Sequence, residues 1–179
     1  MAKVKLFPHQ VKALEVTKEM SRVAYYLDMG LGKTFVATEK AEQLGTSNII
    51  IVCQKSKIDD WANHFNEFYP RYQVIKYNNP VTEIEPYTVI IINYDLIWRR
   101  KEFNRMKGYT LILDESSYIK GENSKRTKFI LRLKPENIIL LSGTPTGGKY
   151  EELFTQLKLL GWEITKKDYW KTYIGVSIK

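Results

Sequence analysis

The sequence holds a single cysteine, Cys53, among its 179 residues. One cysteine excludes a disulfide framework and a cysteine-based zinc site. Because Cys53 ends an apolar run, we interpret it as a small buried hydrophobe. We therefore expect the chain to be located in a reducing compartment, the cytoplasm.

Long hydrophobic runs are also missing. The longest, such as residues 49–53, are far too short to cross a bilayer, and no apolar signal region follows the N-terminus. The chain lacks repeats and low-complexity segments, while hydrophobic residues make up 44% of it, enough for a real core. We expect a protein without a membrane or secretory role, located in the cytoplasm or associated with a nucleoid or nucleus.

Acidic residues are fewer than basic ones. The chain has 20 Asp and Glu against 28 Lys and Arg, a formal charge of +8. This excess favours a polyanionic partner such as nucleic acid. Charge alone does not identify the partner, because many basic proteins bind no nucleic acid.

Helical and strand patterns alternate along the chain. The predicted helices are His9–Met20, Lys33–Leu44, Lys57–Tyr69, Ser124–Leu133 and Tyr150–Leu160. The predicted strands are Val23–Leu27, Asn48–Cys53, Gln73–Tyr77, Thr88–Asn93, Thr110–Leu113 and Asn137–Leu141. Continuous Val, Ile and Leu runs are typical of a parallel sheet covered on both faces. The sequence therefore predicts one α/β domain, with a mainly parallel central sheet flanked by helices and ligands bound beyond the carboxyl ends of the strands.

Residues 28–34, Asp-Met-Gly-Leu-Gly-Lys-Thr, are the most informative segment. They lie between a predicted strand and a predicted helix, where glycines let backbone N–H groups surround phosphates. Lys33 can reach the β- and γ-phosphates, and the Thr34 hydroxyl can hold Mg²⁺. The alternative is a chance glycine-rich turn. The residues expected to contact ATP here are Met29, Gly30, Leu31, Gly32, Lys33 and Thr34.

Asp114 and Glu115 end a buried apolar strand. Two carboxylates in such a place are costly unless a cation is present, and Mg²⁺ bound to ATP is the natural one. We expect Asp114 to hold the ion and Glu115 to orient or deprotonate the attacking water. The alternative is a strand that runs into an acidic surface turn.

Two further segments carry weaker signals. Ser142, Gly143 and Thr144 follow another strand, where small hydroxyls can bond to a neighbouring carboxylate and sense the nucleotide state; a plain turn before a helix is the alternative. Upstream, the Gln10 amide can pair with the adenine edge, and Phe7 can pack against the base. The alternative there is an ordinary helix start after proline.

These segments, in this order, resemble the first ATPase lobe of Swi/Snf-type superfamily 2 helicases. The resemblance covers the chain from about residue 6 to 174, and it implies a RecA-like fold that binds Mg-ATP. The implied activity is DNA-stimulated ATP hydrolysis that drives translocation along duplex DNA. It also implies that Lys33, Asp114 and Glu115 are catalytic and that residues 142–144 couple nucleotide to DNA.

The sequence departs from this family at several points. The family usually has Ala and then His or Gln where this chain has Ser116 and Ser117, which leaves coupling through Ser117 open. The family usually has a proline near Gln54, which this chain lacks, and Thr146 begins a different run from the family's Gln-Asn-Asn. A second RecA-like lobe has no room in residues 1–179, so we expect it elsewhere in a longer chain or in trans. We expect weak activity from this chain alone, and residues 162–179 as the start of the connection.

Short polar and basic residues after the strands are suited to DNA phosphates, which position a protein without reading sequence. On the helix Ser124–Leu133, cations form one stripe beside an apolar stripe. A solvated surface is the alternative for each residue, and we interpret His64 as a surface histidine. The predicted DNA contacts are Lys55, Ser56, Lys57, Asn93, Tyr94, Lys120, Lys125, Lys128 and Arg132.

Three other functions are consistent with parts of the pattern. A strand-separating helicase on DNA or RNA would share most motifs and would differ in the nucleic acid that stimulates it. A non-catalytic ATP- or DNA-binding module would not need Lys33, Asp114 and Glu115 together. A small-molecule kinase would not need the later motifs in this order.

Overall fold

The computed structural model describes residues 4–81, 83–146 and 148–175, and these contain one six-stranded, all-parallel sheet. Its spatial order is β1-β6-β5-β2-β4-β3. The strands are β1 Arg22–Tyr26, β2 Asn48–Cys53, β3 Gln73–Lys76, β4 Thr88–Asn93, β5 Tyr109–Asp114 and β6 Asn137–Ser142. The structure thus confirms the predicted parallel α/β architecture.

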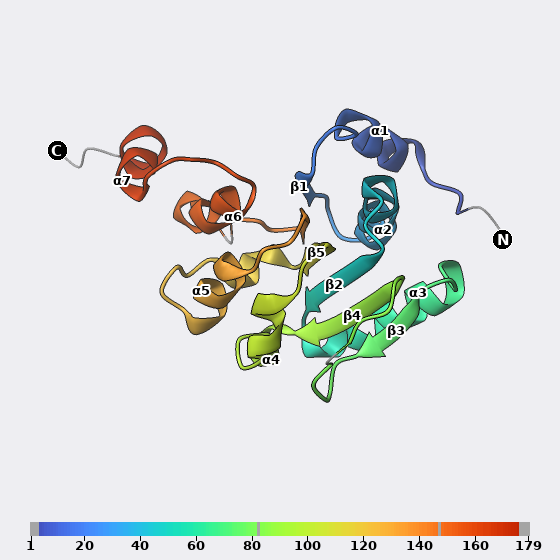
Figure 1. Cartoon of the computed structure of the whole chain (residues 1–179). Helices are drawn as coiled ribbons and strands as arrows, with labels where there is room; N and C mark the ends of the chain where they lie inside the picture. Colours follow the sequence, from blue (N-terminus) through green and yellow to red (C-terminus); the bar gives the residue numbers. More distant parts are fainter. Residues whose placement is uncertain (1–3, 82, 147, 176–179) are drawn as a thin grey trace.

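Helices cover both faces of this sheet (Figure 1). One face carries α1 Pro8–Val16, α2 Lys33–Leu44 and α3 Ile58–Phe68, and the other carries α4 Tyr94–Ile97, α5 Lys125–Arg132 and α6 Phe154–Leu159. After α6 come α7 Lys166–Tyr169 and the π-helical turn η5 Trp170–Ile174. The short 3₁₀ helices are η1 Lys55–Lys57, η2 Lys101–Arg105, η3 Ser116–Ile119 and η4 Tyr150–Leu153. In the described part of the chain, no helix has the length and apolar character needed to span a bilayer.

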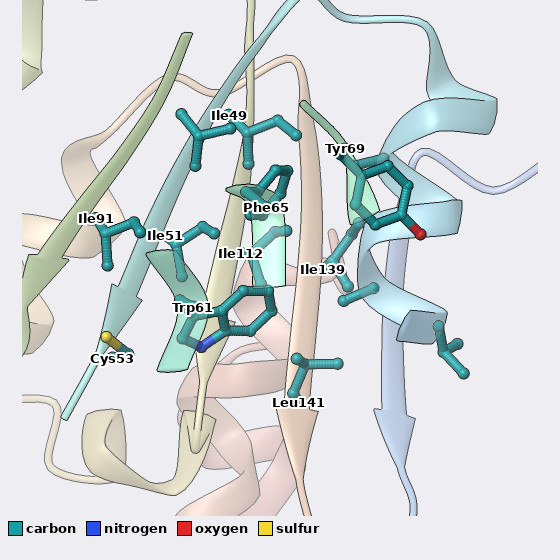
Figure 2. Close-up of a cluster of buried hydrophobic side chains, with 14 of the residues drawn as sticks. Ile49, Ile51, Cys53, Trp61, Phe65, Tyr69, Ile91, Ile112, Ile139 and Leu141 are labelled. Carbon is teal, nitrogen blue, oxygen red and sulfur yellow. The ribbon is translucent and has the colours of Figure 1, made fainter. Parts of the chain in front are cut away.

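The core consists of two apolar layers, one on each side of the sheet. Successive strand residues point to opposite faces, so Ile49 and Ile51 pack under α2 and α3, while Ile50 and Val52 pack under α4 and α5. Figure 2 shows the first layer, with Trp61 of α3 over the sheet. Cys53 belongs to this layer and is fully buried, as expected.

Three predicted elements have the observed bounds: α2, β2 and β4. The predicted helix over 150–160 is instead two pieces, because its first turn is the tighter 3₁₀ helix η4, a common way for a helix to begin. Helix α1 ends at Val16, earlier than predicted. The Thr17 hydroxyl there donates to Ala13 O at 2.8 Å, and the buried Lys40 ammonium of α2 donates to Thr17 O at 2.6 Å. A cation at a helix C-terminus is favourable, and this contact fixes α1 on α2.

His64 corrects a prediction, because its side chain is buried among aromatic rings rather than exposed. Its Nε2 lies 3.0 Å from Thr38 Oγ1, which itself donates to Thr34 O. Burial lowers the pKa of His64 to about 4. Trp61 and Phe65 lie at helical spacing around His64 and mark this face of α3 as buried.

The buried His64 should make the stability of the fold depend on pH. Its pKa is depressed on folding, so the unfolded chain binds the extra proton between about pH 6.5 and 4. Stability should be complete above this window and fall by at most about 3 kcal/mol within it. Urea denaturation at pH 7.5 and 5 should show a smaller pH difference in His64→Phe than in wild type. His9→Phe, which alters the exposed histidine, is the control, and an equal pH difference in all three proteins would contradict the assignment.

Candidate nucleotide-binding site

Most of the predicted nucleotide residues meet at the carboxyl edge of the sheet. The ends of β1, β2 and β5 open onto a cavity of about 520 Å³. Since parallel strands place all their carboxyl ends on one edge, distant segments of sequence meet there. The lining residues are Met29, Gly30, Gly32, Lys33, Thr34, Gln54, Lys57, Asp60, Trp61, Asp114 and Glu115.

The phosphate loop depends on two glycines. Gly30 and Gly32 have φ values of 80° and 71°, which residues other than glycine rarely adopt. A Cβ at Gly32 would also collide with the Gln10 side-chain nitrogen. Helix α2 begins at the next residue, so its N-terminus faces the loop, as in anion sites built on helix N-termini.

Lys33 is folded back onto the loop that carries it. Its Nζ donates to Leu27 O at 2.9 Å and to Asp28 O at 3.2 Å. Gly143, in the turn after β6, is a close neighbour, since a Cβ there would lie 3.7 Å from Lys33 Nζ and 3.6 Å from Leu27 O. The phosphate loop and the turn after β6 are therefore packed together.

A second cavity, of about 420 Å³, adjoins the first across Gly30 and Gly32 and is lined by Phe7 and Gln10. The Gln10 amide has protein partners: Oε1 accepts from Phe7 N at 2.8 Å, and Nε2 donates to Leu31 O at 3.2 Å and Gly32 O at 3.4 Å. The buried Gln10 thus holds the phosphate loop through the carbonyl oxygens of Leu31 and Gly32. The exposed Phe7 ring stacks on His9 beside this cavity.

Asp114 is mostly withdrawn from water at the end of β5. The Trp61 indole donates to Asp114 Oδ2 at 2.8 Å, and the Tyr94 hydroxyl donates to Asp114 O at 2.8 Å. Burial raises the pKa of Asp114, against the opposing effects of the Trp61 hydrogen bond and the Lys33 and Lys57 cations. A nearby divalent cation would favour the ionised form of this carboxyl.

Glu115 has a strained backbone, with φ 54° and ψ 61°. Such left-handed geometry is uncommon outside glycine and often marks functional sites. Its Oε2 accepts from the buried Ser142 hydroxyl at 3.3 Å, and Ser142 Oγ accepts from Thr144 N at 3.0 Å. The structure therefore forms the predicted link between the hydroxyl turn and a carboxylate.

The donor set fits Mg²⁺ held jointly with a nucleotide. Thr34 and Asp114 line the same cavity, and hydroxyl and carboxylate oxygens suit this ion, which usually takes only one or two protein carboxylates and completes its shell with phosphates and water. The described residues contain no group of three or more His, Cys, Asp or Glu side chains that could hold a metal. A site completed by phosphates agrees with that finding.

The predicted DNA contacts divide into two groups. Lys55, Ser56, Lys120 and the α5 cations Lys125, Lys128 and Arg132 are exposed, while Phe129 and Ile130 of α5 are buried as predicted. Tyr94 is a correction, because its side chain is 2% exposed and its hydroxyl bonds to Asp114 O. Asn93 caps α4, accepting from Asp95 N and Leu96 N at 3.0 Å each. Lys57 lines the nucleotide cavity and pairs with Asp60 at 2.9 Å.

Arg126 connects α5 to the Asp-Glu turn. Its guanidinium lies 5.5 Å from the Tyr118 ring centre and 5.7 Å from that of Tyr94, two rings that stack at 5.1 Å. Arg126 also pairs with Asp95 at 3.4 Å. Sequence reasoning missed Arg126, as it missed Trp61 as a partner of Asp114, because no spacing rule brings these residues together.

Comparisons with known proteins agree with this geometry. Residues 25–178 match the SNF2-related domain family. A SWI/SNF-related matrix-associated actin-dependent regulator of chromatin subfamily A-like protein 1 homolog of Caenorhabditis elegans is 31% identical over 87% of this chain and 24% of its own length. The human chromatin-remodeling ATPase INO80 is 30% identical over 74% of this chain and 10% of its own length. The chain thus spans a quarter or less of these two relatives.

Among solved structures, the Sulfolobus solfataricus SWI2/SNF2 ATPase core in complex with dsDNA matches with a TM-score of 0.84. It is 22% identical, and the match covers 94% of this chain and 39% of that one. At this identity the match shows the fold, and it confirms the predicted RecA-like architecture.

The strain at Glu115 can be measured with two substitutions that both remove its carboxylate. Glu115→Gly should be more stable than Glu115→Ala by about 1 kcal/mol, because only glycine is at ease in left-handed backbone. Lys120, with φ −64°, is the control position, and there the glycine variant should be the less stable of the pair. Urea denaturation gives both differences, and an alanine variant at 115 as stable as the glycine one would contradict the strain.

Proposed function

This chain belongs to the SNF2-related domain family, and we propose that it is the first motor lobe of an ATP-dependent, DNA-stimulated translocase on double-stranded DNA. One observation supports this most directly. Lys33, Thr34, Asp114 and Glu115 line one cavity, and the Ser142 turn contacts Glu115. This cavity combines a phosphate loop, a place for a metal and a carboxylate for water.

In this proposal Lys33 leaves the carbonyl oxygens of its own loop to bind the β- and γ-phosphates. Thr34 and Asp114 hold Mg²⁺, which supplies charge neutralisation for the phosphates. Glu115 orients a water and takes its proton as the water oxygen bonds to the γ-phosphorus and the bond to the β-phosphate oxygen breaks. The cavity beside Phe7 has room for the adenosine part of the nucleotide.

The DNA part of the proposal rests on the exposed cations after β2 and on α5, and the solved relative named above is an ATPase core bound to dsDNA. We propose that a second RecA-like lobe, in the same polypeptide or in trans, completes the site with an arginine that is worth about 10³ to 10⁵ in rate in related phosphoryl transfers. The relatives' names are those of chromatin proteins, so a location on DNA is part of the proposal.

The ATP site can be tested with two substitutions, one expected to weaken binding and one expected to abolish hydrolysis alone. Lys33→Ala should weaken Mg-ATP binding by a factor of ten or more, because the variant lacks the cation that binds the β- and γ-phosphates. A tenfold loss corresponds to about 1.4 kcal/mol of binding free energy. Glu115→Gln should bind Mg-ATP like wild type and lose hydrolysis, because it keeps the shape and removes the base. Fluorescent-nucleotide titration and phosphate release with duplex DNA give both values. Hydrolysis by Glu115→Gln at the wild-type rate would refute the role of Glu115.

The α5 surface can be tested through salt dependence. Replacing Lys125, Lys128 and Arg132 with Gln should weaken duplex binding and reduce the slope of log K against log salt by about 2 to 3, since each lost phosphate contact contributes about 0.9. The control removes three exposed cations elsewhere, Lys12, Lys18 and Lys107. Equal slopes in both triple variants would mean that α5 is only a solvated surface. Stronger stimulation by double-stranded RNA than by duplex DNA would favour an RNA helicase.

A further inference from the structure

Gln156 of α6 is a fully buried amide at the junction of three segments of the nucleotide site. Its Oε1 accepts from the Tyr26 hydroxyl at 2.9 Å and from the Ser116 hydroxyl at 2.6 Å. Its Nε2 donates to Pro145 O at 2.8 Å. Both lone pairs of the carbonyl oxygen and one amide hydrogen are therefore in use.

Each of these partners lies in or beside a segment that carries the ATP site. Tyr26 is the last residue of β1, and only Leu27 separates it from the phosphate loop of residues 28–34, while Ser116 directly follows the strained Glu115. Pro145 follows the turn whose Ser142 hydroxyl contacts the Glu115 carboxylate. One amide thus joins the backbone segments that carry the loop, the carboxylates and the hydroxyl turn.

We propose that Gln156 is a positioning residue that holds the Asp-Glu turn and the turn after β6 in fixed relation to the end of β1. The inference rests on the proposed function, since the position being held is that of Glu115 toward a bound nucleotide. An apolar side chain of similar size could fill the same space, but it would leave the Ser116 hydroxyl and Pro145 O unpaired. Unpaired buried polar groups are costly, so the segments would separate to reach water.

Ser116 supplies the hydroxyl on which the contact between Gln156 and the Asp-Glu turn depends. Ser116 is fully buried, and its hydroxyl donates to Gln156 Oε1. Ser116 and Gln156 therefore form a matched pair, 40 residues apart in sequence.

The test uses the full chain and two variants, Gln156→Leu and Ser116→Ala. The matched control is Asn137→Leu, which removes another buried amide, one that donates to Thr110 Oγ1 at 3.2 Å at the opposite, amino-terminal edge of the sheet. Three quantities are compared: amide hydrogen exchange, the Kd for Mg-ATP, and single-turnover hydrolysis with duplex DNA.

In Gln156→Leu, exchange should rise about tenfold in residues 115–120 and 142–146, beyond any rise elsewhere in the chain. Hydrolysis should fall about tenfold while the Kd for Mg-ATP changes by less than about threefold, because the loss lies in the transition state rather than in binding. Ser116→Ala should show the same pattern with smaller changes. Asn137→Leu should loosen neither segment, and its hydrolysis should match wild type.

Two results would overturn the proposal: equal exchange of the two segments in Gln156→Leu and Asn137→Leu, or loosened segments with wild-type hydrolysis. If Gln156→Leu does not fold, Ser116→Ala decides alone, and wild-type behaviour of that variant would count against the pair. A wild-type chain no more active than Lys33→Ala would mean that this lobe does not hydrolyse ATP without the second lobe. The exchange comparison would then still decide whether Gln156 holds the two segments.

Discussion

The site depends on the register of β6 between β1 and β5. Tyr26 lies opposite Ser142 in one pair, and Asp114 lies opposite Leu141 in the other. This register brings the phosphate loop, the Asp-Glu pair and the hydroxyl turn to one height at the edge of the sheet. A slip by one residue would move every side chain of β6 to the other face, so the two core layers that select this register also select the geometry of the site.

The same edge of the sheet contains two residues that lower the stability of the fold. Asp114 is a carboxylate whose pKa is raised by burial, and Glu115 has left-handed backbone. Each of these costs free energy that the apolar layers on both faces must offset. Such locally unfavourable residues, gathered at one edge of an otherwise regular sheet, indicate a functional site.

The sequence predicted what is local or periodic. Continuous apolar runs predicted the parallel strands, and the glycine pattern predicted the loop that leads into α2. What it could not predict depends on contacts between distant segments. The position of Tyr94 directly after a strand predicts an exposed side chain. In the structure its hydroxyl instead donates to Asp114 O. Gln156 lies in an amphipathic helix with no local sign that its amide meets Ser116 and Pro145.

The non-local contacts also connect the nucleotide cavity to the basic surface. From Arg126 on α5, contact passes through the stacked Tyr118 and Tyr94 rings to the backbone of Asp114. From Asp114, the chain continues through Glu115 to Ser116 and the buried Gln156. Of the two stacked rings, Tyr94 is buried and Tyr118 is 44% exposed. These contacts form a continuous path of side chains from α5 to the Asp-Glu turn within this one lobe, which no element boundary in the sequence indicates.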